Sequence, residues 1–200
     1  MLIYASLSGA IAQLGERIPC TDEVVGSIPT GSTIFTMKDS ISLIGMAGAG
    51  KTTVGEVLSK KLSLKFVDSD QIIESLYGNT QQIIDIQGKE RFKALEEEVL
   101  LSIEFDKTLL STGGSAIFSF SAMEYLRKFS EIIYLEVPFE MISNRVGNFD
   151  GRGFIKNSKQ SFRDAFQERE SLYKKYADHI VENKDTVEQC VESILNLYNN

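Results

Sequence analysis

The feature that most constrains this 200-residue chain is a glycine-rich loop between a short apolar run and an amphipathic segment. Residues 45–52 read GMAGAGKT, which fits the pattern G-x-x-x-x-G-K-[ST]. The run before the loop, 40–45, is of β type, and the segment after it, 51–62, has apolar residues at helical spacing. Backbone N–H groups of such a loop turn toward a phosphate, and the helix N-terminus adds its dipole. The loop therefore predicts that the chain binds a nucleoside triphosphate.

The same loop supplies a candidate residue for each part of bound MgATP. Lys51 can reach the β- and γ-phosphates, and Thr52 can offer its hydroxyl to Mg²⁺. The residues predicted to hold the ATP phosphates are Gly48, Ala49, Gly50, Lys51, Thr52 and Thr53.

Short β-type runs alternate with amphipathic stretches along the rest of the chain. The predicted strands are 40–45, 64–67, 108–111, 132–137 and 179–182. The predicted helices include 51–62, 91–105, 160–178 and 185–198. Strands that alternate with helices form βαβ units, so we expect an α/β fold with a five-stranded parallel sheet flanked by helices.

Two carboxylates close the second predicted strand, Asp68 and Asp70. Residues two apart on a strand lie on the same side, so both can face the ligand-binding edge of the sheet. One carboxylate could then hold the Mg²⁺ hydration shell, and the other could accept a proton from a substrate hydroxyl. The alternative for either residue alone is that it only caps a helix beginning at Gln71.

The first 36 residues lack the periodicity of the remainder and carry neither a signal-peptide nor a transit-peptide pattern. Residues 12–17 can be encoded by a sequence similar to the D-arm of a tRNA gene, and 26–29 by one similar to the T-arm. We therefore expect 1–36 to be a non-domain leader, a translated tRNA gene, with the authentic start at Met37 and a single domain over 37–200. The alternative is a genuine extension.

Composition narrows the function classes. The net charge of −7 argues against nucleic-acid binding. The sequence contains no run of about 18 apolar residues, the length that a membrane-spanning helix needs. Two distant cysteines and one histidine leave no disulfide framework and no multi-histidine metal site. We expect a cytoplasmic, monomeric enzyme that acts on a small molecule.

Motifs along 38–198 together resemble the shikimate kinases. Besides the phosphate loop, the matching stretches are 67–74, 88–96, 111–115 and 169–173. The resemblance implies transfer of the γ-phosphate of MgATP to the 3-hydroxyl of shikimate, on the route to chorismate and the aromatic amino acids. It also implies a fold similar to that of nucleoside monophosphate kinases, with a mobile lid around 147–158.

The resemblance further implies roles for individual residues. Asp68 matches an acidic residue near Mg²⁺, so the predicted metal-binding residues are Thr52 and Asp68. The catalytic residues implied are Lys51, Asp70 and Arg152, of which Arg152 belongs to the lid. The nucleotide contacts implied, besides the loop, are Arg145 and Arg152. The substrate contacts implied are Asp70, Lys93, Gly113, Gly114, Ser115 and Arg169.

Three positions depart from the family pattern. Lys93 stands where the family has an arginine that holds the substrate carboxylate, which removes a planar two-pronged contact. Ser115 replaces the last glycine of a Gly-Gly-Gly turn, and Gly153 replaces the proline of the lid. Glu96 aligns with a family glutamate that orients the missing arginine, so we expect it to pair with Lys93 here.

Two other functions stay open from the sequence. A related kinase could use the same machinery on another polyol or sugar acid, such as gluconate. A nucleotide-binding regulator without catalysis would be expected to lack Lys51, Asp70 or Arg152, and all three are present.

Overall fold

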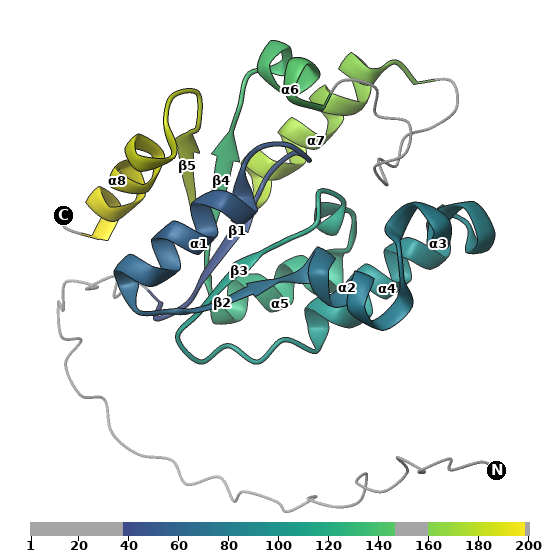
Figure 1. Cartoon of the computed structure of the whole chain (residues 1–200), viewed down its shortest axis with the longest axis horizontal. Coiled ribbons are helices and arrows are strands. Elements are labelled where there is room, and N and C mark those ends of the chain that lie inside the picture. The colour runs from purple at the N-terminus through teal and green to yellow at the C-terminus, as the bar shows by residue number, and fades with distance from the viewer. Residues whose placement is uncertain (1–37, 147–159, 199–200) are drawn as a thin grey trace, which may run out of the picture. The chain divides into compact units, whose positions relative to one another are not determined.

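The computed structural model describes residues 38–146 and 160–198 (Figure 1). The leader 1–36, the lid expected at 147–158 and its residues Arg152 and Gly153 therefore lie outside the described residues.

Five parallel strands form the centre of the domain. They are β1 (Ile41–Ile44), β2 (Lys65–Asp68), β3 (Thr108–Ser111), β4 (Glu131–Glu136) and β5 (His179–Glu182). Their order in the sheet is β2-β3-β1-β4-β5, and every pairing is parallel. This confirms the predicted five-stranded parallel sheet. The connection after β1 leads past β3 to β2, whereas the connection after β3 leads past β1 to β4 on the other side, so a crevice opens between the carboxyl ends of β1 and β3.

Helices cover both faces of this sheet. On one face α1 (Lys51–Leu62) and α8 (Val187–Tyr198) bury side chains such as Val54, Leu58 and Val191 against the strands. The other face carries α4 (Lys89–Leu101), α5 (Phe120–Phe129), α6 (Phe139–Val146) and α7 (Phe162–Tyr176). A short 3-10 helix, η1 (Ala116–Phe118), precedes α5. Within the described ranges, no helix is both long and apolar enough to cross a membrane.

A third apolar cluster joins α2 (Ser69–Tyr77) and α3 (Thr80–Gln87) to α4, with Ile73, Ile83 and Phe92 at its centre. These three helices lie together to one side of the sheet (Figure 1). They carry several of the residues predicted to meet the substrate.

Several helix ends differ from the predicted ranges. The helix expected from Gln71 begins at Ser69, because Asp68 ends β2 and caps α2 directly. The predicted helix 91–105 runs from Lys89 to Leu101, since the chain then turns away to bury Ile103. The individual helices α3, α5 and α6 were not predicted, and Asn79 caps α3 in the same way that Asp68 caps α2.

Candidate active site

The phosphate loop connects β1 to α1 and keeps several N–H groups available. Gly48 and Gly50 have φ of 80° and 88°, a region that favours glycine. A Cβ on Gly48 would stand 2.6 Å from Val146 Cγ2. The first hydrogen bond of α1 runs from Val54 N to Gly50 O, at 2.9 Å. The N–H groups of the first turn therefore have no partner within the helix and form a phosphate-binding end.

Lys51 lies buried over this loop. Its Nζ donates to Gly45 O at 2.8 Å and to Met46 O at 2.9 Å. Burial lowers the pKa of the Lys51 amino group, and the nearby carboxylates of Asp70 and Asp68 oppose that shift. The Lys51 amino group is thus held by two carbonyl groups of the loop, next to the place where the phosphates of a nucleotide would lie.

Thr52 and Asp68 form the predicted metal-binding pair. Thr52 Oγ1 donates to Asp68 Oδ2 at 2.7 Å, while Oδ1 accepts from the backbone N–H of Asp70 at 3.0 Å and of Gln71 at 3.3 Å. Asp68 therefore caps α2 with one oxygen and reaches Thr52 with the other, so it is not only a cap. Two adjacent oxygen donors suit Mg²⁺, which usually takes one or two protein ligands besides phosphate and water. Larger clusters of potential metal ligands are absent from the described residues.

Asp70 lies in the first turn of α2, not on the strand, and its side chain is open to solvent. The crowding of protein atoms around it raises the pKa of the Asp70 carboxyl, and Lys51 opposes this. A Cβ on Gly113 would stand 2.7 Å from Asp70 Oδ1 and 2.1 Å from Glu96 Oε1. The turn after β3 thus presses its bare backbone against both carboxyl groups.

Two cations predicted to hold a substrate carboxylate face one aromatic ring. Lys93 Nζ lies 5.8 Å from the centre of the Phe118 ring, and Arg169 Cζ lies 5.0 Å from it. Arg169 is buried on α7, and burial lowers the pKa of its guanidinium group. A cavity of about 310 Å³ has Lys93, Ser115 and Phe118 in its wall. The structure therefore brings the two predicted substrate cations together.

The expected pairing of Glu96 with Lys93 is wrong. Lys93 Nζ donates to Glu90 Oε1 at 2.9 Å, one turn earlier on α4. Glu96 Oε2 accepts instead from Ser115 Oγ at 2.5 Å. Ser115, which stands where the family has a glycine, is therefore the partner of Glu96 in place of Lys93.

Three residues that the sequence did not single out support the site. Ser69 Oγ accepts from Gly113 N at 2.9 Å, and Tyr173 OH donates to Gly114 O at 2.7 Å. Asn183 Nδ2 donates to Ala49 O at 2.7 Å, which ties the phosphate loop to the end of β5. Only their positions in the sequence could have indicated two of these residues. Asn183 directly follows the predicted strand 179–182, and Tyr173 ends the family-like stretch 169–173.

Arg145 is the predicted nucleotide contact nearest the lid. It lies in the last turn of α6, and its Nη1 donates to Gly48 O at 3.4 Å. It is therefore next to the phosphate loop.

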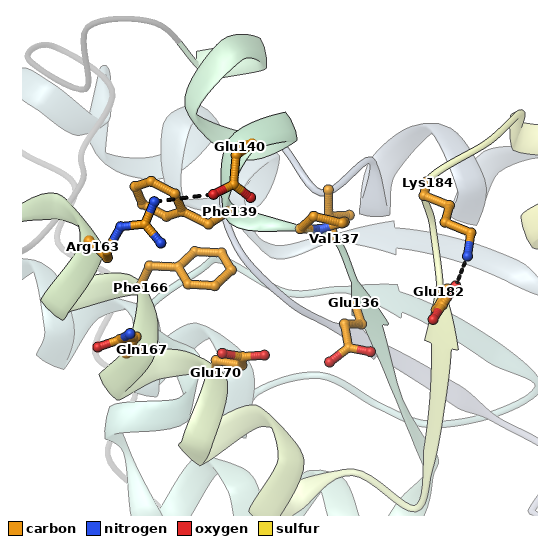
Figure 2. Close-up of a pocket in the computed structure, with 11 residues that line it drawn as sticks. Glu136, Val137, Phe139, Glu140, Arg163, Phe166, Gln167, Glu170, Glu182 and Lys184 are labelled. Atoms are coloured by element: carbon orange, nitrogen blue, oxygen red, sulfur yellow. Dashed lines mark hydrogen bonds and ion pairs between the residues drawn. The ribbon is translucent and has the colours of Figure 1, made fainter.

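A separate pocket of about 440 Å³ lies beyond the carboxyl ends of β4 and β5 (Figure 2). Its charged groups pair with one another or with Lys174, which binds both Glu136 and Glu170. The other pairs are Arg163 with Glu140 and Lys184 with Glu182. No predicted site residue lines this pocket, and each of its charged side chains already contacts a group of opposite charge.

Comparison with known proteins identifies one family. The family model described as "Shikimate kinase" matches residues 47–199. A shikimate kinase of Clostridium botulinum (strain Eklund 17B / Type B) is 34% identical over 159 residues, covering 79% of this chain and 96% of the relative.

Solved structures give the same result. Shikimate kinase from Acinetobacter baumannii in complex with shikimate has a TM-score of 0.72 and 31% identity, covering 82% of this chain and 93% of that one. Shikimate kinase from Aquifex aeolicus has a TM-score of 0.70 and 31% identity, covering 80% and 96%. This chain therefore belongs to the shikimate kinase family.

Proposed function

We propose that this chain transfers the γ-phosphate of ATP to the 3-hydroxyl of shikimate. The observation that carries the proposal is the arrangement along one edge of the sheet. Lys51 and Asp70 lie at the phosphate end, and Lys93 and Arg169 lie around Phe118. This arrangement matches an acceptor whose hydroxyl faces Lys51 and Asp70 and whose carboxylate faces Lys93 and Arg169.

The phosphate loop supports the nucleotide half of this proposal. The N–H groups at the start of α1 and the Lys51 amino group supply positive charge for the β- and γ-phosphates. Thr52 and Asp68 are the residues that would hold Mg²⁺, which neutralises phosphate charge when bound. Arg145, beside the loop, would meet the base of the nucleotide.

Asp70 supports the acceptor half. We assign it as the group that orients the 3-hydroxyl and takes its proton. The hydroxyl oxygen forms a bond to the γ-phosphorus while the bond from phosphorus to the bridging oxygen breaks, and ADP leaves. A raised pKa suits a group that must accept a proton, and Lys51 nearby limits the rise.

Lys93 is the observation that favours a second candidate acceptor. A lysine binds a carboxylate as a point charge, without the fixed fork of an arginine. A sugar acid such as gluconate therefore stays as the alternative substrate. A non-catalytic regulator is less well supported, because Lys51 and Asp70 are both present and near each other.

One assay separates these functions. ADP release is followed with the full chain, ATP and MgCl₂, in the presence of shikimate, gluconate or no acceptor. We expect release that depends on shikimate. Release with gluconate alone favours the sugar acid, and release with neither contradicts an enzyme acting on either acid. Gel filtration with light scattering tests our further proposal that the chain acts as a monomer.

A further inference from the structure

Glu96 carries a buried carboxyl group that the reaction outlined above does not use. Its side chain is 2% exposed in the middle of α4. Oε2 accepts from Ser115 Oγ, whereas Oε1 makes no hydrogen bond to any residue that the structure describes. A buried acceptor without a donor costs free energy, so its presence needs an explanation.

The position of Oε1 indicates what could supply the donor. The point where a Cβ of Gly113 would stand is 2.1 Å from Glu96 Oε1 and 2.7 Å from Asp70 Oδ1. The two carboxyl groups are therefore neighbours across the bare Cα of this glycine. Asp70 is itself exposed to solvent. A molecule that binds against Asp70 can thus also reach Glu96.

We propose that Ser115 is a positioning residue: its hydroxyl fixes the Glu96 carboxyl so that Oε1, beside Asp70, accepts a hydrogen bond from a second hydroxyl of the acceptor. This inference rests on the proposed function and narrows the acceptor to an alcohol with adjacent hydroxyls. The terminal torsion of a glutamate is broad, so without Ser115 the carboxyl group is free to turn. Ser115 acts through Glu96, because its own hydroxyl is directed at Oε2.

Several elements place charged or titratable groups around Glu96. These are Asp70 on α2, Lys51 on α1, and Arg169 and Tyr173 on α7. Burial and then Asp70 raise the pKa of Glu96 to about 7, and the hydrogen bond from Ser115 opposes the rise. Loss of the Ser115 hydroxyl therefore raises this pKa further.

The test uses Ser115→Ala in the full chain. The pH dependence of kcat/KM for shikimate reports ionisations of the free enzyme. If ionised Glu96 accepts the second hydroxyl, the acidic limb of the profile moves upward by about one pH unit. At pH 6 kcat/KM then falls about ten-fold, and at pH 9 it stays near the wild-type value. Ser115→Thr keeps a hydroxyl and should restore the wild-type profile.

A matched control is a second serine–glutamate pair, between α4 and the residue that follows η1. Ser119 Oγ donates to Glu97 Oε2 at 2.7 Å and also caps α5. Ser119→Ala loses the same kind of serine–glutamate hydrogen bond together with a helix cap. We expect it to lower Tm and to leave the pH position of the profile unchanged.

The inference is overturned if Ser115→Ala lowers Tm while its profile coincides with that of the wild type. It is also overturned if Ser115→Thr shifts the profile as alanine does. If the alanine variant fails to fold, Ser115→Gly takes its place in the same assay.

A carboxyl ¹³C NMR titration gives an independent readout. The Glu96 signal is assigned by its loss in Glu96→Gln, and we expect its midpoint to rise when the Ser115 hydroxyl is removed. An unchanged midpoint contradicts the inference. This readout does not require turnover, so it separates failure of the inference from failure of the proposed function, which shows as a wild-type chain inactive on shikimate.

Discussion

The substitution Lys93→Arg tests the acceptor pocket most sharply. In the present structure Lys93 pairs with Glu90 on an exposed helix surface, where Glu90 is 86% exposed. Such a pair contributes about 0.3–0.5 kcal/mol, so the lysine can leave it for a substrate carboxylate at little cost. An arginine at this position adds a second N–H contact to that carboxylate. It also stacks better on the Phe118 ring, which lies 5.8 Å from the present amino group.

The size of the effect follows from these contacts. A hydrogen bond to a charged group contributes about 1.5–3 kcal/mol, but water replaces part of that contact beside a lysine. We expect a net gain of about 1 kcal/mol, which corresponds to a KM for shikimate about five-fold lower. The kcat should change little, because the carboxylate is remote from the transferred phosphoryl group.

Initial rates at saturating ATP with varied shikimate measure this change, and KM for ATP should stay constant. Arg91→Lys is the matched control, since Arg91 forms an exposed pair with Glu98 at 3.1 Å on the same helix. That exchange should leave both KM values unchanged. If Lys93→Arg leaves the shikimate KM unchanged or abolishes activity, the pocket is built around lysine, and another acid becomes the better substrate candidate.

Three further changes test other parts of the account. Asp70→Asn should reduce kcat about 10²–10⁴-fold with little change in ATP affinity, and near-wild-type turnover would reduce Asp70 to a structural role. Tyr173→Phe leaves the Gly114 carbonyl without its donor, so thermal unfolding should show Tm lower by about 2–10 °C, and an unchanged Tm refutes that hydrogen bond. A chain that begins at Met37 should match the full chain in Tm and turnover, whereas a loss of several degrees contradicts a dispensable leader.

The local patterns of the sequence were sufficient for the sheet and for the first helix. β3 and β5 occupy the predicted residues, and α1 has the predicted bounds. The loop between β1 and α1 also followed from local spacing, because a glycine-rich turn before a helix depends on neighbouring residues. Phosphate binding by this segment stays a prediction, which rests on the same local pattern.

The remainder of the site depends on contacts between distant parts of the chain. Tyr173 and Gly114 are 59 residues apart, and Asn183 and Ala49 are 134 apart, so no local pattern pairs them. The partner of Glu96 was wrong for a related reason. Lys93 precedes Glu96 by one turn on α4, but the Glu96 carboxyl group is directed toward the turn between β3 and η1, where Ser115 lies. Asp68 both caps α2 and accepts a hydrogen bond from Thr52, and this combination could be recognised only once the structure placed Thr52 beside it.

Identification of the product tests the central claim most directly. The chain is incubated with ATP, MgCl₂ and shikimate, and the mixture is examined by ³¹P and ¹H NMR. The account predicts one new phosphate monoester, coupled to the proton on C3 of shikimate and formed in equal amount with ADP. Its formation should be strongly slowed by Asp70→Asn. ADP without phosphorylated shikimate, or a phosphate on another hydroxyl, would contradict the arrangement of Asp70 and the acceptor proposed for this site.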